Sequence, residues 1–600
     1  MREHELKPAR GEVAGICAIL AVFMAVLAAL AFDTGVTVDE PAHLLSSYLY
    51  WQGKDTLQPG DMPTMIRLAG GWVPHLTGLR LPNKNHEVWK SNHEWNVSQE
   101  MMASMNAAEI ARAFHWARLP MLVFPAGCCL LIWWWGRQLF SSAAGLLAAL
   151  AWALCTLVLG HGALFKNDLM ASFAYLLFWY KIWVFWRAPA ARNAAWMGVA
   201  VLVAVMSKYS LLVFLPVAPA VVLLRTFTVR LPAKQAALML ALLVAIPYAG
   251  IQLTWLSPLK KISPQEVQAW AHAGEKPDWS VAAVRTMAAL RMPPRFVRGV
   301  MSLVDVNAAG SAVYLLGKVY NAGHPAYFLI AMAVKLNLAL LAVILAGTAG
   351  SALTLIRGKR EWADLCWFAP AFLYIGLASL SNLQLGLRLI LPGIAFLILM
   401  AGWWLDWAWR LRSGRVAVLL LFGWMAGRTA LAYPHYISDF NLAAGGPDNG
   451  LAYLSDSNID WGQDVARLAK IVRQQRIPRI RLAYFGLDNP YAYLSDPAMQ
   501  TLAPPWSDDM VSSTRFVPEP GYYAISATLL TGQFFVEKYR DYYSCFRRMK
   551  PIAKAGYSIW IFLVPSAASS DSPEPPVDRS PDLRPASGPA FTMHLSIRAE

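Results

Sequence analysis

The sequence predicts a polytopic α-helical membrane protein, with about eleven transmembrane helices and a small soluble α/β domain at the C-terminus. Of its 600 residues, 57% are hydrophobic and only 15% are charged, which lies outside the usual range of soluble proteins. Apolar runs long enough to cross a bilayer recur along most of the chain. From about residue 433 these runs give way to short alternating segments of ordinary polarity.

Each long apolar run is predicted to be a helix, because backbone polar groups inside lipid must be paired within the segment. A run of roughly 20 apolar residues is enough to cross the bilayer. The first run has no small-residue cleavage site and further spans follow it, so we expect a retained helix rather than a cleaved signal peptide. The predicted spans are 13–32, 116–136, 143–163, 168–186, 194–207, 209–224, 235–255, 325–350, 363–380, 389–407 and 416–432.

The loops between these spans predict the orientation. Arg and Lys gather in alternate short loops, after residues 136, 186, 224, 356 and 409, and near the N-terminus, so these parts are expected to be cytoplasmic. An odd number of spans then exports the C-terminus. We therefore predict a multi-pass protein of a bacterial inner (plasma) membrane, with the segments 33–115, 256–324 and 433–600 on the periplasmic or extracellular side.

The net charge of +15 does not indicate a nucleic-acid partner. The cations lie mainly between apolar runs, where orientation and lipid phosphate account for them. Five of the six cysteines lie in or beside apolar runs, so no disulfide framework is expected.

The C-terminal region, 433–565, is predicted to be an exported α/β domain. ARLAKIVRQQ (466–475) has helical spacing, whereas 480–486, 522–527 and 557–564 have the pattern of strands. We expect this domain to guide the acceptor rather than to perform chemistry. The Ser/Pro-rich segment 566–600 carries too little apolar surface to fold and is predicted to be a disordered tail.

Two adjacent acids, Asp39 and Glu40, begin the first external loop, where the first helix leaves the membrane. Carboxylates at this position could act as a general base toward an acceptor hydroxyl, or hold a divalent cation against a phosphate. The alternative is structural, with Asp39 as the N-cap of a helix and Glu40 in its first turn. The residues leave the requirement for a metal open.

Three more charged residues are predicted to lie on the same side of the membrane. Asp168 follows a turn between two spans, Lys208 separates two short apolar runs, and Arg388 precedes another span. Ionisable residues at membrane level are costly and are candidates for function. Arg388 could hold a phosphate by a two-pronged contact and Lys208 as a point charge, whereas Asp168 could simply cap the next helix.

Two further regions are rich in polar residues. The loop 291–327 interleaves basic and aromatic residues, among them Arg295 and Lys318, which suits a substrate sugar or a lipid headgroup as well as a plain interfacial belt. The run 456–464 resembles the start of a calcium loop, but Trp461 stands where that loop needs glycine. We therefore expect Asp460 and Gln463 to form a capping box for the following helix.

Six segments together resemble one family. They are VDEPAHLLSSYLYW (38–51), the stretch 117–154, GHGALFKNDLMASFAYL (160–176), SKYSLLVFLP (207–216), LSNLQLGLRLILPGIAFL (380–397) and AAGGPDNGLAYLSDSNIDWGQDVARL (443–468). Their order and spacing resemble the C-type, multi-span glycosyltransferases of family 39. These are related to dolichyl-phosphate-mannose:protein mannosyltransferases and to the bacterial aminoarabinose transferase of lipid A.

The resemblance implies a C-type glycosyltransferase fold and a polyprenyl-phosphate sugar donor. It also implies catalytic acids at Asp39, with Glu40 beside it, and at Asp168. The donor phosphate would be held by basic residues for which Lys208 and Arg388 are the positional matches. Candidate substrate-binding residues beyond these are His43, Arg295 and Lys318.

One departure from the family concerns the acceptor side. Many relatives carry a His-Pro-Pro run after the first acid, whereas this chain has Asp61-Met62-Pro63-Thr64. The acceptor, whether protein, lipid or polysaccharide, and the contribution of Asp61 therefore stay open.

The predicted function is transfer of a hexose or pentose to an acceptor on the outer face of the membrane, with inversion at the anomeric carbon. The sequence contains no G-x-x-x-x-G-K-[ST] phosphate loop, so no nucleotide site is expected. The alternatives are a transporter or lipid flippase of a glycan pathway, because acids and bases at membrane level also mark transport paths, and a noncatalytic assembly subunit.

Overall fold

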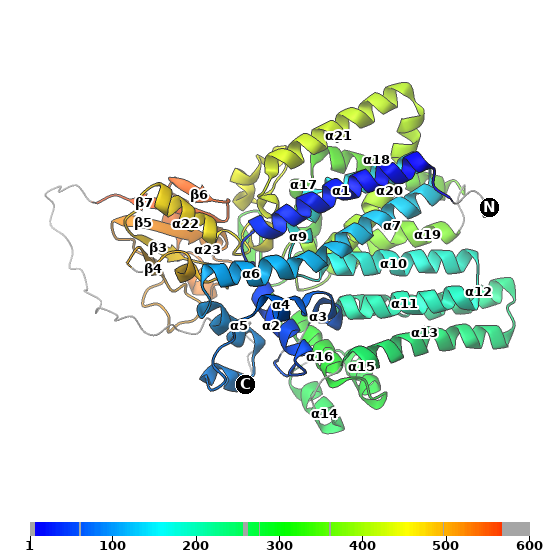
Figure 1. Cartoon of the computed structure of the whole chain (residues 1–600), viewed down its shortest axis with the longest axis horizontal. Coiled ribbons are helices and arrows are strands. Elements are labelled where there is room, and N and C mark those ends of the chain that lie inside the picture. Colours follow the sequence, from blue (N-terminus) through cyan, green and yellow to red (C-terminus); the bar gives the residue numbers. More distant parts are fainter. Residues whose placement is uncertain are drawn as a thin grey trace.

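The computed structural model describes residues 7–58, 62–255, 262–274, 276–358, 362–495 and 497–566. Asp61 and the predicted tail from residue 567 lie outside the described residues. A bundle of long helices occupies one end of the molecule and a small sheet the other, and α1 (Arg10–Asp33) begins at the end farthest from the sheet (Figure 1). This separation agrees with an odd number of spans.

The predicted spans have helical counterparts in the described part of the chain. Eight segments are long and apolar enough to cross a membrane, and a bent pair of helices, α8 (Ser142–Ala153) and α9 (Thr156–Gly162), forms a ninth candidate with an angle of 60°. Two shorter apolar helices, α11 (Ala191–Ser207) and α19 (Leu365–Ser379), account for the remaining predictions. The eight are Arg10–Asp33, Ala107–Leu139, Asp168–Arg187, Tyr209–Val229, Ala233–Thr254, Leu338–Ile356, Leu387–Arg410 and Arg412–Ala432. The chain is thus a multi-pass membrane protein, as the sequence predicted.

Helix α20 (Leu391–Arg410) forms the centre of the bundle and contacts α8, α10 (Asp168–Arg187), α18 (Leu338–Ile356) and α19. In the span that contains α20, 78% of the residues of its apolar window are buried inside the protein, whereas in the span of α1 this share is only 22%. Close approach depends on small residues: a Cβ added to Gly347 of α18 would clash with the backbone of α20. The peripheral helices keep apolar side chains exposed, as a lipid-facing surface requires.

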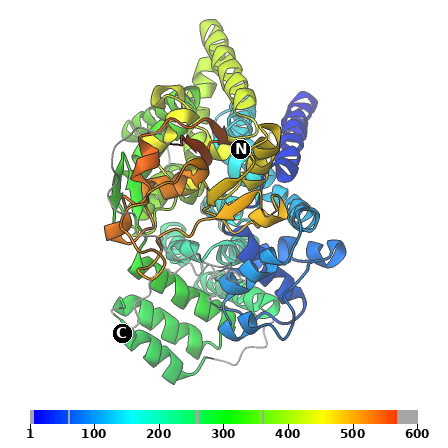
Figure 2. The same cartoon turned by 90° about the vertical axis from the view of Figure 1, so that its left-hand side faces the viewer.

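The long loops at the sheet end of the bundle are themselves helical. The segment after α1 forms α2 (Glu40–Trp51), α3 (Thr64–Gly70), α4 (Val73–Thr77) and α5 (Glu94–Ala103). The segment before α17 (Tyr327–Lys335) forms α14 (Pro264–His272), α15 (Asp278–Ala289), α16 (Pro294–Ala309) and the hairpin of β1 (Val313–Leu315) and β2 (Lys318–Tyr320). Figure 2, viewed from the sheet end, shows these helices beside the sheet. All of them therefore lie at the same end of the bundle as the sheet.

The C-terminal sheet has five strands in the order β4-β3-β5-β7-β6. Its strands are β3 (Ile480–Ala483), β4 (Met499–Thr501), β5 (Gly521–Ser526), β6 (Ala553–Ala555) and β7 (Ile559–Val564), with β3 parallel to β4 and β5, and β7 antiparallel to β5 and β6. Alternate residues face α22 (Val465–Gln474) on one side, where Leu482 and Ile561 pack, and α23 (Ala527–Thr531) with α24 (Ser544–Arg547) on the other. The predicted α/β fold of this region is confirmed, whereas its boundary at 433 stays a prediction.

The predicted capping box is wrong. Helix α22 begins at Val465, and neither Asp460 nor Gln463 caps it. Gly462 adopts a left-handed conformation, with φ of 84°, and turns the chain before the helix starts. The carboxylate of Asp460 instead accepts hydrogen bonds from the backbone N–H groups of Thr528, at 2.9 Å, and Gly462, at 3.2 Å. Asp460 thus joins this turn to α23.

This buried acid predicts how stability depends on pH. Burial raises the pKa of Asp460 to about 7, so the folded protein holds this proton more tightly than the unfolded chain does. Its contribution to stability is therefore largest at acidic pH and is lost as the pH rises from about 4 to about 7, at about 1.4 kcal/mol per pH unit. In thermal unfolding of the full chain in detergent, Asp460→Asn should make stability less dependent on pH across this range. Asp448→Asn, at a side chain that is 71% exposed, should not, and an unchanged pH dependence in Asp460→Asn would contradict the assignment.

The second prediction concerns orientation. Three spans, those of α19, α20 and α21 (Arg412–Ala432), separate Arg357 from Ala444. Reporter domains fused after these two residues should therefore give opposite signals for the two sides of the membrane, with the fusion after Ala444 outside. Equal signals would mean that one of the three helices does not cross.

Candidate active site

Charged side chains converge where the loops at the sheet end of the bundle, the helix ends and the C-terminal region meet. Asp39 lies just before α2, Lys166 in the turn before α10, and Asp168 is the first residue of α10. Lys208 occupies the break between α11 and the 3₁₀ helix η4 (Tyr209–Phe214), and Arg388 lies in the 3₁₀ turn η6 (Leu387–Ile390) that precedes α20. The structure thus brings together five charges from distant parts of the sequence.

Asp39 forms an ion pair with Lys166, whose Nζ also lies 2.8 Å from Nε2 of His43. Burial raises the pKa of Asp39, but the charges of Lys166 and Arg388 outweigh this effect and lower it to about 2. Burial, reinforced by Lys166, keeps the pKa of His43 well below its usual value. Asp39 is therefore an ionised carboxylate, while His43 is neutral. Asp39 occupies the N-cap position of α2 and Glu40 lies in its first turn, as the structural alternative predicted, but the Asp39 side chain makes no cap hydrogen bond.

Arg388 bridges the two acids of the cluster. Its Nη1 lies 3.3 Å from Oδ2 of Asp168 and its Nη2 lies 3.6 Å from Oδ2 of Asp39. The other oxygen of Asp168, Oδ1, accepts a hydrogen bond of 2.7 Å from Nζ of Lys208. Lys208 has extended backbone, with φ of −159°, so the chain leaves α11 there and the lysine reaches back to Asp168. This break explains why the two apolar runs beside Lys208 are short.

The segment 455–461 covers this cluster from the C-terminal side. The guanidinium of Arg388 lies 4.2 Å from the centre of the Trp461 ring, and its Nε donates to Oγ of Ser457 at 3.0 Å. Gly386, with φ of 124°, allows the close approach, because a Cβ there would clash with the hydroxyl of Ser457. The C-terminal region therefore contributes contacts to the candidate site, and its expected role in guiding the acceptor stays a prediction.

Glu40 faces different partners from those of Asp39. Its Oε1 and Oε2 accept hydrogen bonds from Nε and Nη2 of Arg118, at 2.7 and 2.6 Å. The backbone N–H groups of Thr37, at 2.9 Å, and Phe165, at 2.7 Å, also donate to it. Since Phe165 precedes Lys166, the buried Glu40–Arg118 pair holds both loops that carry the Asp39–Lys166 ion pair. These are the contacts of a residue that positions its neighbours.

The other two predicted substrate-binding residues have different surroundings. Arg295 is buried and forms ion pairs with Asp55, at 3.1 Å, and Glu94, at 3.6 Å. Two acids of the segment after α1 thus neutralise it and join α16 to that segment. Lys318 is exposed on β2. The structure does not bring either residue into contact with the ionic cluster.

Sequence reasoning missed several contacts of the site. Lys166 could have been identified from the sequence, because it lies two residues before Asp168 in a segment that was already singled out. Trp461, Ser457 and Arg118 offered no local signal, because only the fold brings them to the charged residues. In the described part of the chain, no three His, Cys, Asp or Glu side chains gather in a way that could hold a metal ion.

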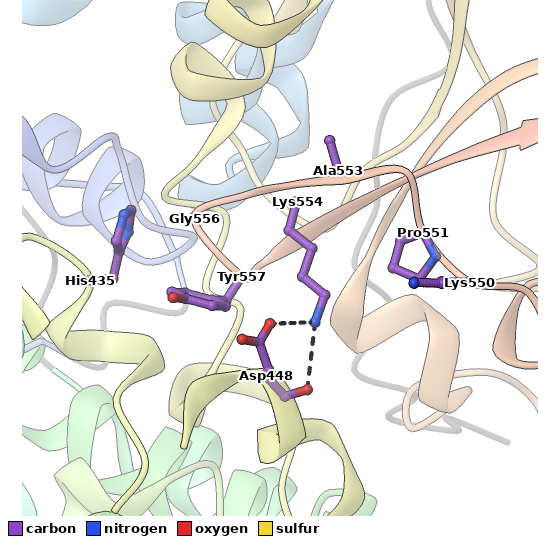
Figure 3. Close-up of a pocket in the computed structure, with 8 residues that line it drawn as sticks. All are labelled: His435, Asp448, Lys550, Pro551, Ala553, Lys554, Gly556 and Tyr557. Carbon is purple, nitrogen blue, oxygen red and sulfur yellow. Dashed lines mark hydrogen bonds and ion pairs between the residues drawn. The ribbon is translucent and has the colours of Figure 1, made fainter. Parts of the chain in front are cut away.

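A surface cleft of about 590 Å³ lies elsewhere, between the loop after α21 and the β6–β7 hairpin (Figure 3). Nζ of Lys554 reaches across it to Oδ1 of Asp448, at 2.9 Å, beside Tyr557. No residue of the ionic cluster lines this cleft. We therefore identify the candidate site by the cluster of charged residues and not by this cleft.

Comparisons with known proteins give one family match. Residues 109–251 match the family model described as dolichyl-phosphate-mannose-protein mannosyltransferase. No curated protein matches the chain. Among solved structures, the chain is similar to ArnT from Cupriavidus metallidurans bound to undecaprenyl phosphate, with 13% identity, a TM-score of 0.44, and 92% of this chain and 98% of that chain covered. It is also similar to the Archaeoglobus fulgidus oligosaccharyltransferase tethered with an acceptor peptide, with 10% identity, a TM-score of 0.39, and 85% and 69% covered.

The matched segment contains three members of the ionic cluster, Lys166, Asp168 and Lys208. The family resemblance that the motifs predicted is confirmed through this segment. The chain is thus a multi-pass membrane protein whose residues 109–251 resemble the dolichyl-phosphate-mannose-protein mannosyltransferase family.

Proposed function

We propose that this protein transfers a sugar from a polyprenyl phosphate to an acceptor hydroxyl on the outer face of a bacterial inner membrane, with inversion of the anomeric carbon. The observation that carries the proposal is the ionic cluster, in which Lys208 and Arg388 both contact Asp168 at the mouth of a helical bundle. An apolar lipid tail would lie along the bundle, with its phosphate at these cations and its sugar outside.

The charge balance of the cluster favours a phosphate ligand. Three cations, Lys166, Lys208 and Arg388, face the carboxylates of Asp39 and Asp168. Lys208 is also the most open of these cations, with 20% of its side chain exposed, so a headgroup can reach it. A phosphate would complete the neutralisation and, as it departs, would be stabilised by the same cations.

Asp39 is the proposed general base. In the transfer, the acceptor oxygen forms a bond to the anomeric carbon as the bond from that carbon to the phosphate oxygen breaks. The acceptor proton passes to Asp39, and the polyprenyl phosphate leaves with the bonding electrons. A pKa of about 2 makes Asp39 a weak base in the resting protein. A bound phosphate that draws Lys166 and Arg388 toward itself would raise this pKa, so the donor would activate the base.

Cells that lack the protein provide the direct test. Mass spectrometry of their glycans, lipids and proteins should reveal a sugar that is missing, which would identify the product and the acceptor together. The wild-type gene should restore this sugar and the Asp39→Asn variant should not. An unchanged glycan profile in the absence of the protein would contradict the proposal.

The third prediction concerns Asp39 in the purified protein. Asp39→Asn should lower turnover by about 10²–10⁴-fold, because an amide keeps the shape of the side chain but cannot accept the proton. Binding of polyprenyl phosphate should be largely retained. Asp33→Asn is a matched control at the end of α1, since the Asp33 side chain is 46% exposed and pairs only with Arg467, at 3.6 Å, in the described ion pairs. If Asp39→Asn kept more than about a tenth of wild-type turnover, Asp39 would not be the base.

The fourth prediction concerns the phosphate. Arg388→Gln should lower turnover by about 10²–10³-fold, because it removes a charged donor from the departing phosphate and leaves Asp168 with Lys208 alone. Arg388→Lys should recover only part of this loss, since an ammonium group makes no two-pronged contact. Arg410→Gln changes an arginine at the far end of α20 whose side chain is 70% exposed, and it should leave turnover unchanged. Equal effects of Arg388→Gln and Arg410→Gln would rule out this role.

A further inference from the structure

Asp456 lies on the segment that covers the ionic cluster, but the proposed mechanism does not use it. It begins the 3₁₀ helix η10 (Asp456–Asn458) and its side chain is buried. Its backbone is left-handed, with φ of 56°, a conformation that residues other than glycine adopt rarely. Its N–H donates to Oγ1 of Thr528 at 3.2 Å, and the next residue, Ser457, contacts Arg388. The fold therefore holds this carboxylate beside the cluster at a conformational cost.

One oxygen of Asp456 is free. Its Oδ2 is buried and has no hydrogen-bond partner among the residues that the structure describes. The other acids nearby are occupied: Oδ2 of Asp39 pairs with Lys166, and both oxygens of Asp168 pair with cations. Because a buried acceptor without a partner is destabilising, such a group in a protein calls for an explanation. A hydroxyl group of a bound ligand would supply the missing hydrogen bond.

The charged and titratable groups around Asp456 connect it to the active site. Arg388 and Asp39 lie close enough for their charges to act on the Asp456 carboxyl group. Tyr327 lies close enough for the charge of Asp456 to act on its hydroxyl group. Burial raises the pKa of Asp456 to about 7, against the effect of Arg388. Near neutral pH this side chain can therefore accept a hydrogen bond when it is ionised and donate one when it is protonated. Both suit recognition of hydroxyl groups, which donate and accept.

The position of Asp456 fits the sugar better than the phosphate or the lipid. If the lipid tail follows the bundle and the phosphate lies at Lys208 and Arg388, the sugar extends from the phosphate toward the C-terminal region. Asp456 comes from that region, and its neighbour Ser457 accepts a hydrogen bond from Arg388, so Asp456 lies close to the proposed phosphate contact. The ring of Trp461 is not available as a sugar platform, because it is buried and covered by Arg388.

We propose that Asp456 binds a hydroxyl group of the transferred sugar through its free oxygen, and so helps to select which sugar is transferred. This proposal rests on the proposed function, since it requires a sugar joined to a polyprenyl phosphate. It assigns to Asp456 a role in donor recognition that is separate from the proton transfer to Asp39 and from the phosphate contacts of Arg388.

Equilibrium binding to the purified full chain in detergent tests the proposal. The probes are undecaprenyl phosphate and a panel of undecaprenyl-phosphate-linked hexoses and pentoses that differ in single hydroxyl groups. Wild-type protein should bind at least one sugar-linked lipid more tightly than undecaprenyl phosphate. Asp456→Asn should weaken binding of that lipid by about ten- to a hundredfold, the usual effect of losing a hydrogen bond to a charged group, and change binding of undecaprenyl phosphate by less than about twofold.

Two further variants keep the result interpretable. Asp456→Gly removes the carboxylate but favours the left-handed backbone, so it should fold even if the amide is poorly accommodated. Asp464→Asn changes a buried acid nearby whose oxygens pair with Ser558, at 2.7 Å, and Arg467, at 2.5 Å, and it should preserve the preference for the sugar-linked lipid.

Each other outcome overturns the proposal in a distinguishable way. Equal loss of affinity for both kinds of lipid in the Asp456 variants would mean that the residue supports the fold or the phosphate site. A wild-type protein that binds undecaprenyl phosphate but prefers no sugar-linked lipid would refute the role of Asp456 and leave the proposed phosphate site intact. Failure of the wild type to bind undecaprenyl phosphate would refute the proposed function, and the role of Asp456 with it.

Discussion

The organisation of the molecule depends on the need to neutralise Arg388. A buried guanidinium is strongly destabilising unless carboxylates and hydrogen-bond acceptors surround it. Here it is surrounded by Asp39 from the loop between α1 and α2, Asp168 from the start of α10, and Ser457 with Trp461 from the C-terminal region. One side chain thus holds together three parts of the chain that are far apart in sequence. The fold around the site follows from satisfying this charge.

The same constraint links structure to mechanism. In the resting protein, Asp39 forms an ion pair with Lys166, and Asp168 forms one with Lys208. The groups proposed to bind phosphate therefore already have anionic partners. In the proposed mechanism, a phosphate enters by sharing these cations, and this sharing weakens their hold on Asp39. Donor binding and activation of the base are then one electrostatic event. The Glu40–Arg118 pair makes this possible, because it keeps the two loops fixed while the ion pairs between them rearrange.

The sequence was sufficient for the parts of the structure that repeat a simple physical pattern. Apolar runs predicted the spans, and alternation of side chains predicted three strands of the sheet, whereas β4 and β6, with three residues each, were too short to recognise. Asp39, Asp168, Lys208 and Arg388 were found because a charge at membrane level is conspicuous. The ion-pair partners of Arg295, Asp55 and Glu94, could not be predicted, because they come from a segment that is distant in sequence, and its role in substrate binding stays a prediction.

The run 456–464 was the hardest region to interpret, because its acids suit a calcium loop, a helix cap and an active site about equally well. The structure separates them by their partners. Asp460 accepts hydrogen bonds from Thr528 and Gly462, and Asp464 contacts Ser558. Of these three acids, only Asp456 has a buried oxygen without a hydrogen bond from the described residues. Acids a few residues apart thus divide into two that stabilise the C-terminal region and one that faces the membrane cluster. That division explains why this polar run belongs both to the sheet domain and to the site: the acids that anchor it to the sheet hold Trp461 and Ser457 against Arg388.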